Sequence, residues 1–296
     1  MDRRFFPWRV VAPAALIIAL LCPVLAGAAA AKVGVVAAEN FYGNIVQQVG
    51  GERVSVTSIL SDPNVDPHEY ESSVDDAKAI AGANLVIENS GGYDDWMDKL
   101  LSASPNPKRV VLKGFDLAKT KLPDNEHVWY DVDNAQVIAQ AVSDSLKKLD
   151  PGSATVYAKN LKTFTDSLAR VRQKIAALKA KWNGTPVGLT ETIFLYQAGP
   201  IGLSVLTPLE FQKAIAEGND PPADTVVTAE NQVKGKKIRV LIYNEQTISS
   251  VTTLLQNDAK AAGIPVVPVT ETMPSVMSYQ DWMLSQLAAL EKALGS

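Results

Sequence analysis

The sequence is poor in two side chains that often carry chemistry. Of its 296 residues one is a cysteine, Cys22, and two are histidines, His68 and His127. A single cysteine excludes an intrachain disulfide and any site built from several thiolates. The formal net charge is −4, so the chain lacks the basic excess typical of nucleic-acid-binding proteins, and we expect no nucleic-acid partner.

Long apolar runs are equally scarce, apart from one at the start. The run "VVAPAALIIALLCPVLAGAAAA" follows basic residues and ends in small ones, a pattern typical of a signal peptide cleaved within Ala28–Ala31. We therefore expect residues 1–31 to be a signal peptide that exports a periplasmic protein. An uncleaved membrane anchor is the alternative, which Pro13 and Pro23 and the small residues at its end disfavour.

The single cysteine lies inside this run. Leu20 and Leu21 stand directly before Cys22, where a lipid-attachment signal has small residues. We therefore expect no lipoprotein-type cysteine. The chain after residue 31 then has no thiol, no disulfide and no thiolate-bound metal.

After the first 31 residues, short β-branched runs alternate with helical patterns. This alternation predicts an α/β fold with mainly parallel sheets, and the length leaves room for two lobes. We expect an N-terminal α/β lobe at residues 32–149 and a C-terminal α/β lobe at residues 184–296. The strand-like runs are "KVGVVAA", "RVSVTSIL", "NLVIEN", "RVVLKG", "TPVGLTE", "IRVLIYNE" and "IPVVPVTE".

A long helical pattern connects the two lobes. Apolar residues recur at steps of four and three from Tyr157 to Trp182, with no proline or glycine before Gly184. The pattern predicts one long, rigid connecting helix at residues 150–183. It could form a coiled-coil dimer or a spine packed against both lobes. We favour the spine, and a monomer, because α/β sequence precedes and follows it.

Two further helices have marked starts. Ser73 and Asp76 are spaced as in a capping box, in which the two residues satisfy free backbone N–H groups at a helix start. The last amphipathic pattern begins at Ser278 and stops at Gly295. We expect a helix after each of these serines.

Carboxylates end the last three strand-like runs: Glu191, Glu245 and Glu271. His68 also follows a strand-like run, and His127 lies in the loop "DNEHVWYDVDNAQ". In open α/β sheets, ligands bind outside the carboxyl ends of the strands. These side chains from distant segments are therefore expected to gather at facing edges of the two lobes.

The segments "DPHEYESS" and "EHVWYDVDN" resemble the two histidine motifs of substrate-binding proteins from zinc and manganese ABC transporters, the ZnuA/TroA-like family. The resemblance covers essentially the whole chain after the signal peptide. It implies a binding protein, not an enzyme, that captures a divalent transition metal (zinc or manganese, with iron possible) and delivers it to a membrane permease. It also implies one ion in the cleft between the lobes.

The resemblance implies four ligands: His68, His127, Glu191 and Glu271. Glu191 stands three residues before Phe194 in "TETIFLY", where many zinc-type members have histidine and manganese-type members commonly have glutamate. Glu271 in "PVTETMP" stands where aspartate is usual. The segment "DLAKTKLPDNE" before the second motif is short and lacks the histidines of many zinc-specific relatives. The choice between zinc and manganese is open at this point.

Three other acidic residues stand beside the expected ligands. Asp66 and Glu126 either orient the imidazoles through hydrogen bonds or are solvated loop charges. Glu245 is a neighbour of the site, an alternative fourth ligand, or a charge at the start of the next helix. Two imidazoles with two carboxylates form a sulfur-free donor set that suits zinc, manganese or iron.

Two other functions fit parts of this pattern. An exported metal-dependent hydrolase would use Glu245 or Glu271 as general base, but the sequence has neither H-E-x-x-H nor G-x-S-x-G. A metal-binding adhesin on the same fold, with a role in cell adhesion, is compatible with metal binding.

Overall fold

The computed structural model describes residues 1–5, 31–62, 65, 67 and 70–296. Lys32–Ser296 forms one compact unit, separate from Met1–Ala31, and most of the expected signal peptide lies outside the described residues. In the part of the chain that the structure describes, no helix has the length and apolar character needed to cross a bilayer.

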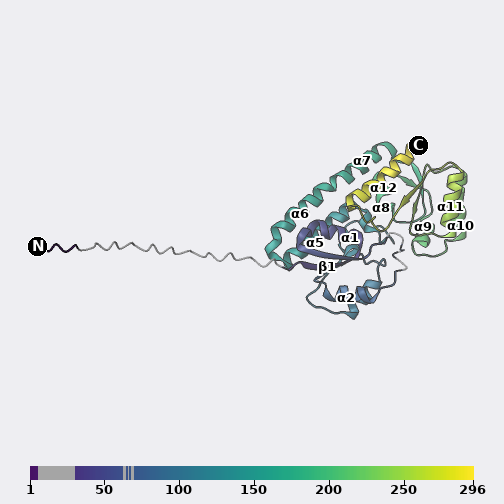
Figure 1. Ribbon diagram of the computed structural model, residues 1–296. Helices are drawn as coiled ribbons and strands as arrows, with labels where there is room; N and C mark the ends of the chain where they lie inside the picture. The colour runs from purple at the N-terminus through teal and green to yellow at the C-terminus, as the bar shows by residue number, and fades with distance from the viewer. Residues whose placement is uncertain (6–30, 63–64, 66, 68–69) are drawn as a thin grey trace. The chain divides into compact units, whose positions relative to one another are not determined.

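The compact unit contains two four-stranded parallel sheets, which confirms the expected α/β class (Figure 1). The strands are β1 (Val33–Glu39), β2 (Val54–Leu60), β3 (Leu85–Glu88), β4 (Val110–Lys113), β5 (Pro186–Leu189), β6 (Ser204–Val205), β7 (Leu241–Asn244) and β8 (Val266–Val269). The first sheet has the order β2-β1-β3-β4 and the second β6-β5-β7-β8. Parallel neighbours bring the carboxyl ends of adjacent strands to one edge of each sheet.

Helices cover both faces of each sheet. They are α1 (Asn40–Gly50), α2 (Val74–Gly82), α3 (Trp96–Ala103), α4 (Gly114–Leu117), α5 (Val132–Leu149), α6 (Ala154–Ser167), α7 (Ala169–Trp182), α8 (Leu195–Ile201), α9 (Leu209–Ala216), α10 (Ala223–Lys234), α11 (Ser250–Ala261) and α12 (Tyr279–Leu294), with short 3₁₀ turns at Gly51–Arg53, Val128–Tyr130 and Pro151–Ser153. Helices α1 and α5 pack on one face of the first sheet and α2 and α3 on the other. On the second sheet, α9, α10 and α11 cover one face.

The alternation of side chains along β1 explains how one strand supports two cores. Val35 and Ala37 belong to the core shared with α1 and α5, whereas Val36 and Ala38 belong to the core under α2 and α3. Successive side chains of a strand point to opposite faces, so a continuous apolar run is what a sheet covered on both sides requires.

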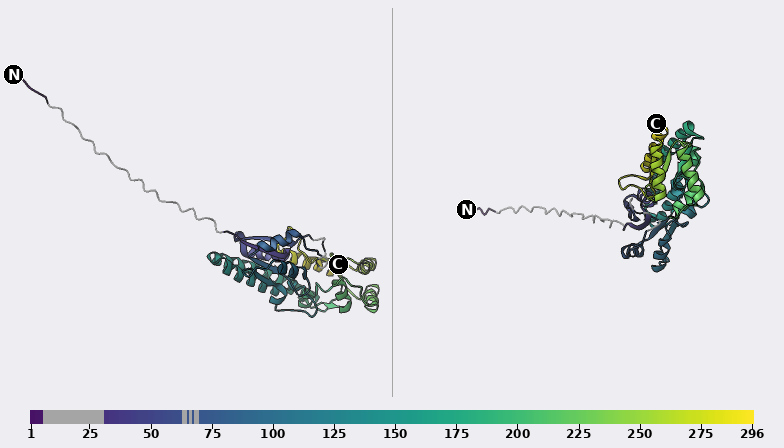
Figure 2. Two further views of the ribbon diagram at one scale, coloured as in Figure 1. Left: turned by 90° about the horizontal axis from the view of Figure 1, so that it is seen from below. Right: turned by 90° about the vertical axis from the view of Figure 1, so that its right-hand side faces the viewer.

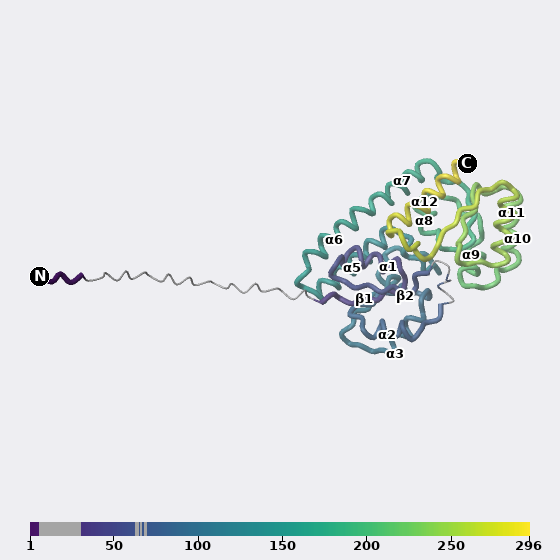
Figure 3. The backbone as a smooth tube through the Cα atoms, in the orientation of Figure 1, coloured from purple at the N-terminus to yellow at the C-terminus, as the bar shows by residue number. Residues whose placement is uncertain are grey.

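The connecting segment is helical and passes along both lobes, as Figures 1 and 3 show. In the two further views, these teal helices again lie at an outer edge of the folded part (Figure 2). Helix α6 packs on α1 and α5, and α7 packs on α8 and α12. The segment therefore contacts both lobes, as a spine does.

The spine is the long helical segment that we predicted, with one interruption at Leu168, which separates α6 from α7. At this point the carbonyl of Phe164 accepts from the hydroxyl of Ser167 at 2.6 Å as well as from the backbone N–H of Leu168 at 3.3 Å. Leu168 itself is fully buried. The single pattern in the sequence therefore corresponds to two successive helices, α6 and α7.

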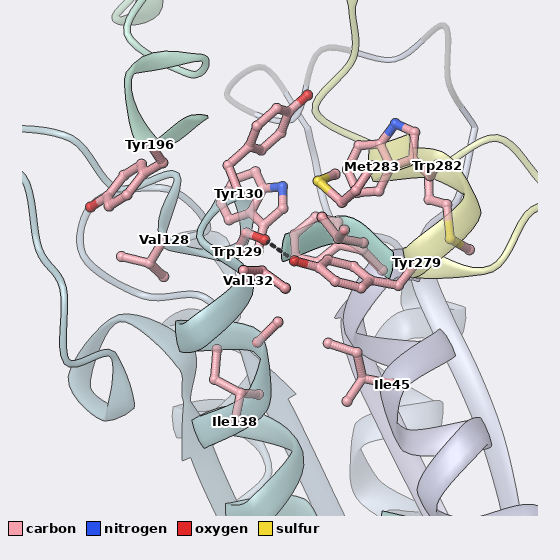
Figure 4. Packing of buried hydrophobic residues seen from close by; sticks show 14 of the residues in the cluster. Ile45, Val128, Trp129, Tyr130, Val132, Ile138, Tyr196, Tyr279, Trp282 and Met283 are labelled. Atoms are coloured by element: carbon pink, nitrogen blue, oxygen red, sulfur yellow. Dashed lines mark hydrogen bonds between the residues drawn. The ribbon is translucent and has the colours of Figure 1, made fainter. Parts of the chain in front are cut away.

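One continuous apolar core extends through both lobes and the spine. Figure 4 shows its aromatic part, where Tyr279 and Trp282 at the start of α12 meet Trp129 and Tyr130. The hydroxyl of Tyr279 donates to the carbonyl of Trp129 at 2.6 Å, and the rings of Tyr130 and Trp282 lie 5.7 Å apart. The C-terminal helix thereby packs against the segment that follows His127.

Both predicted helix starts are confirmed. Ser73 and Asp76 form a complete capping box at α2, and the side chain of Ser278 accepts from the backbone of Asp281 at α12, which ends before Gly295. The elements that we did not expect are mostly short or lack a clear apolar pattern. They are α3, α4, α8, α10 and β6.

Candidate metal centre

His127 is completely buried at the junction of the lobes. It stands directly before the 3₁₀ turn Val128–Tyr130, and its imidazole lies 5.2 Å from the ring of Trp129. The indole is stacked on Phe41 at 4.4 Å, so apolar packing fixes the backbone that carries the imidazole. A buried polar ring in such a place needs defined partners on both nitrogens.

One imidazole nitrogen is oriented by Asn125. The side-chain NH₂ of Asn125 donates to the carbonyl of Thr192 at 2.8 Å, which turns its oxygen towards His127. That oxygen accepts from the backbone N–H of His127 at 3.1 Å and lies 3.0 Å from Nδ1. Because an amide oxygen only accepts, the proton of a neutral His127 is placed on Nδ1. The lone pair is then on Nε2.

Two carboxylates from the other lobe lie on the Nε2 side. Glu191 follows β5 by two residues and Glu271 follows β8 by two residues. Both strands are parallel to β7, which lies between them, so both side chains are delivered to one edge of the sheet. Nε2 of His127 lies 3.3 Å from Oε1 of Glu191 and 3.9 Å from Oε2 of Glu271. The side chains of all three residues are fully buried.

These three atoms form a compact donor group. One ligand atom each from His127, Glu191 and Glu271 lies within 4.8 Å of the others. Three electron-pair donors directed at one another repel unless a proton or a cation lies between them. One imidazole nitrogen and two carboxylate oxygens are a suitable donor set for a divalent transition metal such as zinc.

The carboxylates also accept hydrogen bonds from polar side chains at the end of β7 and in the loop that follows it. The side-chain NH₂ of Asn244 donates to Oε2 of Glu191 and to Oε1 of Glu271, each at 2.5 Å. The hydroxyl of Thr247 donates to Oε2 of Glu191 at 2.7 Å. The side-chain oxygen of Gln246 accepts from the backbone N–H of Glu271 at 2.7 Å. We did not anticipate Asn244, although its place at the end of a strand run was a signal for it.

The structure thus brings together three of the four expected ligands, His127, Glu191 and Glu271. The fourth, His68, lies outside the described residues, as does Asp66. Val65, three residues before His68, is described, and its carbonyl accepts from the side chain of Gln246 at 2.8 Å. This bond joins Val65 to the loop that precedes α11.

Glu245 and Glu126, which the sequence indicated as neighbours of the ligands, do not belong to the donor group of three residues. The side chain of Glu245 is exposed and accepts from the hydroxyl of Tyr243 at 3.3 Å. An oxygen of Glu126 lies 4.0 Å from Nδ1 of His127, farther than the oxygen of Asn125. Asn125 therefore orients the imidazole more directly than Glu126 does.

A second buried carboxyl group lies in the first lobe. Glu39 ends β1 and precedes α1, but its side chain makes no capping bond and is fully buried. Burial, followed by the nearby charge of Asp94 and a hydrogen bond to it, raises the pKa of Glu39 well above its usual value. In the same region, burial raises the pKa of Glu88 to about 7 despite its ion pair with Lys113 at 2.9 Å.

Comparison with known proteins gives one family match and several relatives. A family model described as "ZnuA: Zinc-uptake complex component A periplasmic" matches residues 35–293. The metal ABC transporter substrate-binding lipoprotein ScbA of Streptococcus cristatus is 27% identical over 168 residues, 52% of this chain and 53% of ScbA. The manganese-binding lipoprotein MntA of Halalkalibacterium halodurans is 27% identical over 144 residues, 48% of each chain. The chain thus spans about half the length of the curated relatives that it matches.

Solved structures share the fold. The periplasmic zinc-binding protein TroA from Treponema pallidum superposes with a TM-score of 0.74 at 18% identity, over 89% of this chain and 99% of TroA. A mutant of the laminin-binding adhesin Lmb from Streptococcus agalactiae superposes with a TM-score of 0.73 at 22% identity, over 89% of this chain and 100% of Lmb. At these identities the likeness extends to the fold alone.

The relatives correct one expectation from the sequence. We expected a periplasmic protein without a lipoprotein-type cysteine, and this is contradicted because ScbA and MntA are named lipoproteins. The expectation rested on Leu20 and Leu21 before Cys22, and the identity of two flanking residues was too small a basis for it. Cys22 itself lies outside the described residues.

Proposed function

The chain belongs to the family of zinc-uptake components described as ZnuA, and on that premise we propose that it captures one divalent transition-metal ion and delivers it to an ABC permease for uptake. The observation that carries the proposal is the buried donor group of His127, Glu191 and Glu271. Its members come from both lobes, so an ion held by them is enclosed at the lobe junction.

The charges of the group suit a divalent cation. Two ionised carboxylates and a neutral imidazole balance the charge of the ion, which a buried site requires because an uncompensated charge is costly to desolvate. Neutral His127 presents Nε2 as a ligand while Nδ1 is held by Asn125. No step of chemistry is needed, so the chain acts as a binding protein and not as an enzyme.

We propose His68 as the fourth ligand. Its motif, "DPHEYESS", resembles the first histidine motif of the family, and the bond from Gln246 to Val65 supports a position near Glu271. The exposed side chain of Glu245 favours Glu271 over Glu245 as the carboxylate that completes the set. In this proposal Asp66 and Glu126 are neighbours of the ligands.

The cargo that we propose is zinc or manganese. The family description names zinc, whereas MntA is named for manganese. An N₂O₂ donor set of two imidazoles and two carboxylates suits either ion or iron. A competition experiment between zinc and manganese measures which of the two ions the protein binds more tightly.

We further propose a monomer of two lobes, residues 32–149 and 184–296, joined by the spine at residues 150–183. The core shared by both lobes and the spine supports this arrangement, and it also favours small movements of one lobe against the other. A hydrolase is not favoured, because the matched family consists of uptake components. An adhesin is not favoured either, because the likeness to Lmb extends only to the fold.

Native mass spectrometry of the metal-free protein tests the proposal. Zinc and manganese are offered together to the wild type, to His127→Ala and to Glu245→Gln as a matched control outside the donor group. We expect one ion per chain in the wild type and in the control, and none in His127→Ala. No stoichiometric ion in the wild type would overturn the proposal.

A further inference from the structure

The side chain of Asn244 joins the two carboxylates of the donor group. Asn244 is 2% exposed, and its NH₂ group uses one hydrogen for Glu191 and the other for Glu271. Its oxygen accepts from the backbone N–H of Gln246 at 3.1 Å, which fixes the orientation of the amide. The backbone N–H of Gln246 can only donate, so it faces the side-chain oxygen of Asn244. The NH₂ group of Asn244 is therefore the part that faces the two carboxylates.

The sheet explains why a single amide reaches both groups. Strand β7 lies between β5 and β8, and Asn244 is its last residue. Leu189 pairs with Ile242, so the register continues to place Glu191 level with Asn244. Asn244 also pairs with Val269, two residues before Glu271. The middle strand thus ends on a side chain flanked by both carboxylates.

Because of the bonds from Asn244, the two oxygens of each carboxylate have different neighbours. Oε2 of Glu191 accepts from Asn244 and Thr247, while Oε1 faces His127. Oε1 of Glu271 accepts from Asn244, while Oε2 faces His127. A carboxylate oxygen held by a donor of this kind is kept away from the ion, so each glutamate offers the ion a single oxygen.

We propose that Asn244 is a positioning residue that limits both glutamates to one metal-ligating oxygen and thereby favours zinc over manganese. The inference rests on the proposed function. With one oxygen from each glutamate and Nε2 of His127, the described residues offer three protein ligands, which fits the four-coordinate geometry that zinc prefers. Manganese prefers a larger, oxygen-rich set, which two bidentate glutamates would supply.

The experiment compares wild type, Asn244→Ala and Thr247→Val. The affinity ratio of zinc to manganese is measured by competition with a chelating indicator, and the number of ligands is measured by X-ray absorption at the zinc and manganese edges. Asn244→Ala should lower the zinc-to-manganese ratio by about tenfold, the size of one hydrogen bond to a charged group. Its manganese complex should gain oxygen ligands. Thr247→Val should have a smaller effect in the same direction, because Oε2 of Glu191 keeps its bond from Asn244 and Glu271 keeps its own.

Gln212→Ala is the matched control. Gln212 is another buried amide of the same lobe, and its side chain donates to the carbonyl of Thr207 at 2.8 Å. Its loss should lower stability without changing the affinity ratio or the ligand number. An unchanged ratio and ligand number in a metal-binding Asn244→Ala protein would overturn the inference and leave the proposed function intact. A wild type that binds no ion would overturn both.

Discussion

The side-chain amide of Asn40 pairs with both backbone groups of Met273. Its NH₂ donates to the carbonyl of Met273 at 2.6 Å, and its oxygen accepts from the N–H of Met273 at 2.9 Å. Asn40 begins α1 in the first lobe, and Met273 lies two residues after Glu271 in the second. The first residue of one helix thereby holds the loop that carries a proposed ligand.

The first prediction concerns this contact. Asn40→Ala should lower the free energy of unfolding by about 1–3 kcal/mol, because two buried backbone groups lose their partner. Urea denaturation followed by circular dichroism measures the change. Asn160→Ala is the control, since its side chain makes one bond, to the carbonyl of Val49, and is less buried. Equal losses in both variants would contradict a special role of the contact between Asn40 and Met273.

A second prediction concerns the aromatic junction in Figure 4. Tyr279→Phe retains the ring but removes the donor to the carbonyl of Trp129. We expect a loss of about 1–3 kcal/mol, because the buried carbonyl is left without this bond. Thermal unfolding against Ser285→Ala, which removes a hydroxyl from an exposed residue of the same helix, separates this bond from a general effect of hydroxyl loss. A Tyr279→Phe protein as stable as the wild type would contradict the expectation.

A third prediction follows from the raised pKa of Glu39 beside Asp94. A carboxyl whose pKa is raised on folding stabilises the protein fully below its ordinary pKa of 4.5, and this contribution is lost as pH rises towards the folded value. Glu39→Gln retains a neutral side chain at every pH. Its stability relative to wild type should therefore be greater at about pH 8 than at about pH 5.

Chemical denaturation at the two pH values measures this difference. Glu210→Gln, a change at an exposed glutamate, is the control and should show no such trend. The neighbouring carboxyl of Glu88, with its pKa of about 7, contributes in the same direction and is present in both variants. A Glu39→Gln difference that is constant with pH would contradict the buried, protonated Glu39.

A fourth prediction concerns metal affinity and pH. An imidazole must be neutral to bind the ion, and the pKa of an unperturbed histidine is about 6.5. The affinity for zinc should therefore fall by more than about tenfold between about pH 7.5 and about pH 5. A competition titration with an indicator whose own pH response is known measures it. Unchanged affinity across this range would argue against histidine ligands.

Much of the fold follows from local patterns in the sequence. Buried parallel strands such as "VGVVAA" and the capped start at Ser73 depend on residues that are close in the chain, so sequence predicts them well. The interruption at Leu168 lies within a continuous apolar periodicity, so the periodicity does not reveal it. Strand β6 has two residues and is defined by its pairing with β5.

The candidate site was predictable where it depends on strand ends. Glu191 and Glu271 follow two parallel strands of one sheet, β5 and β8. The resemblance of the histidine motifs to the metal-transporter family, now supported by the family match, added His127. The role of Asn244 was not predictable, because it depends on the order of β5, β7 and β8 in the sheet. Sequence alone does not give that order. It also left open whether Glu245 is a neighbour of the site, an alternative fourth ligand or a charge at the start of the next helix.

The most direct test of the account is the position of the ion itself. A crystal of the protein grown with zinc, with diffraction recorded on both sides of the zinc absorption edge, locates the ion by its anomalous scattering. We predict one peak, within bonding distance of Nε2 of His127, Oε1 of Glu191 and Oε2 of Glu271. A peak elsewhere, for example beside the exposed Glu245, would contradict the account.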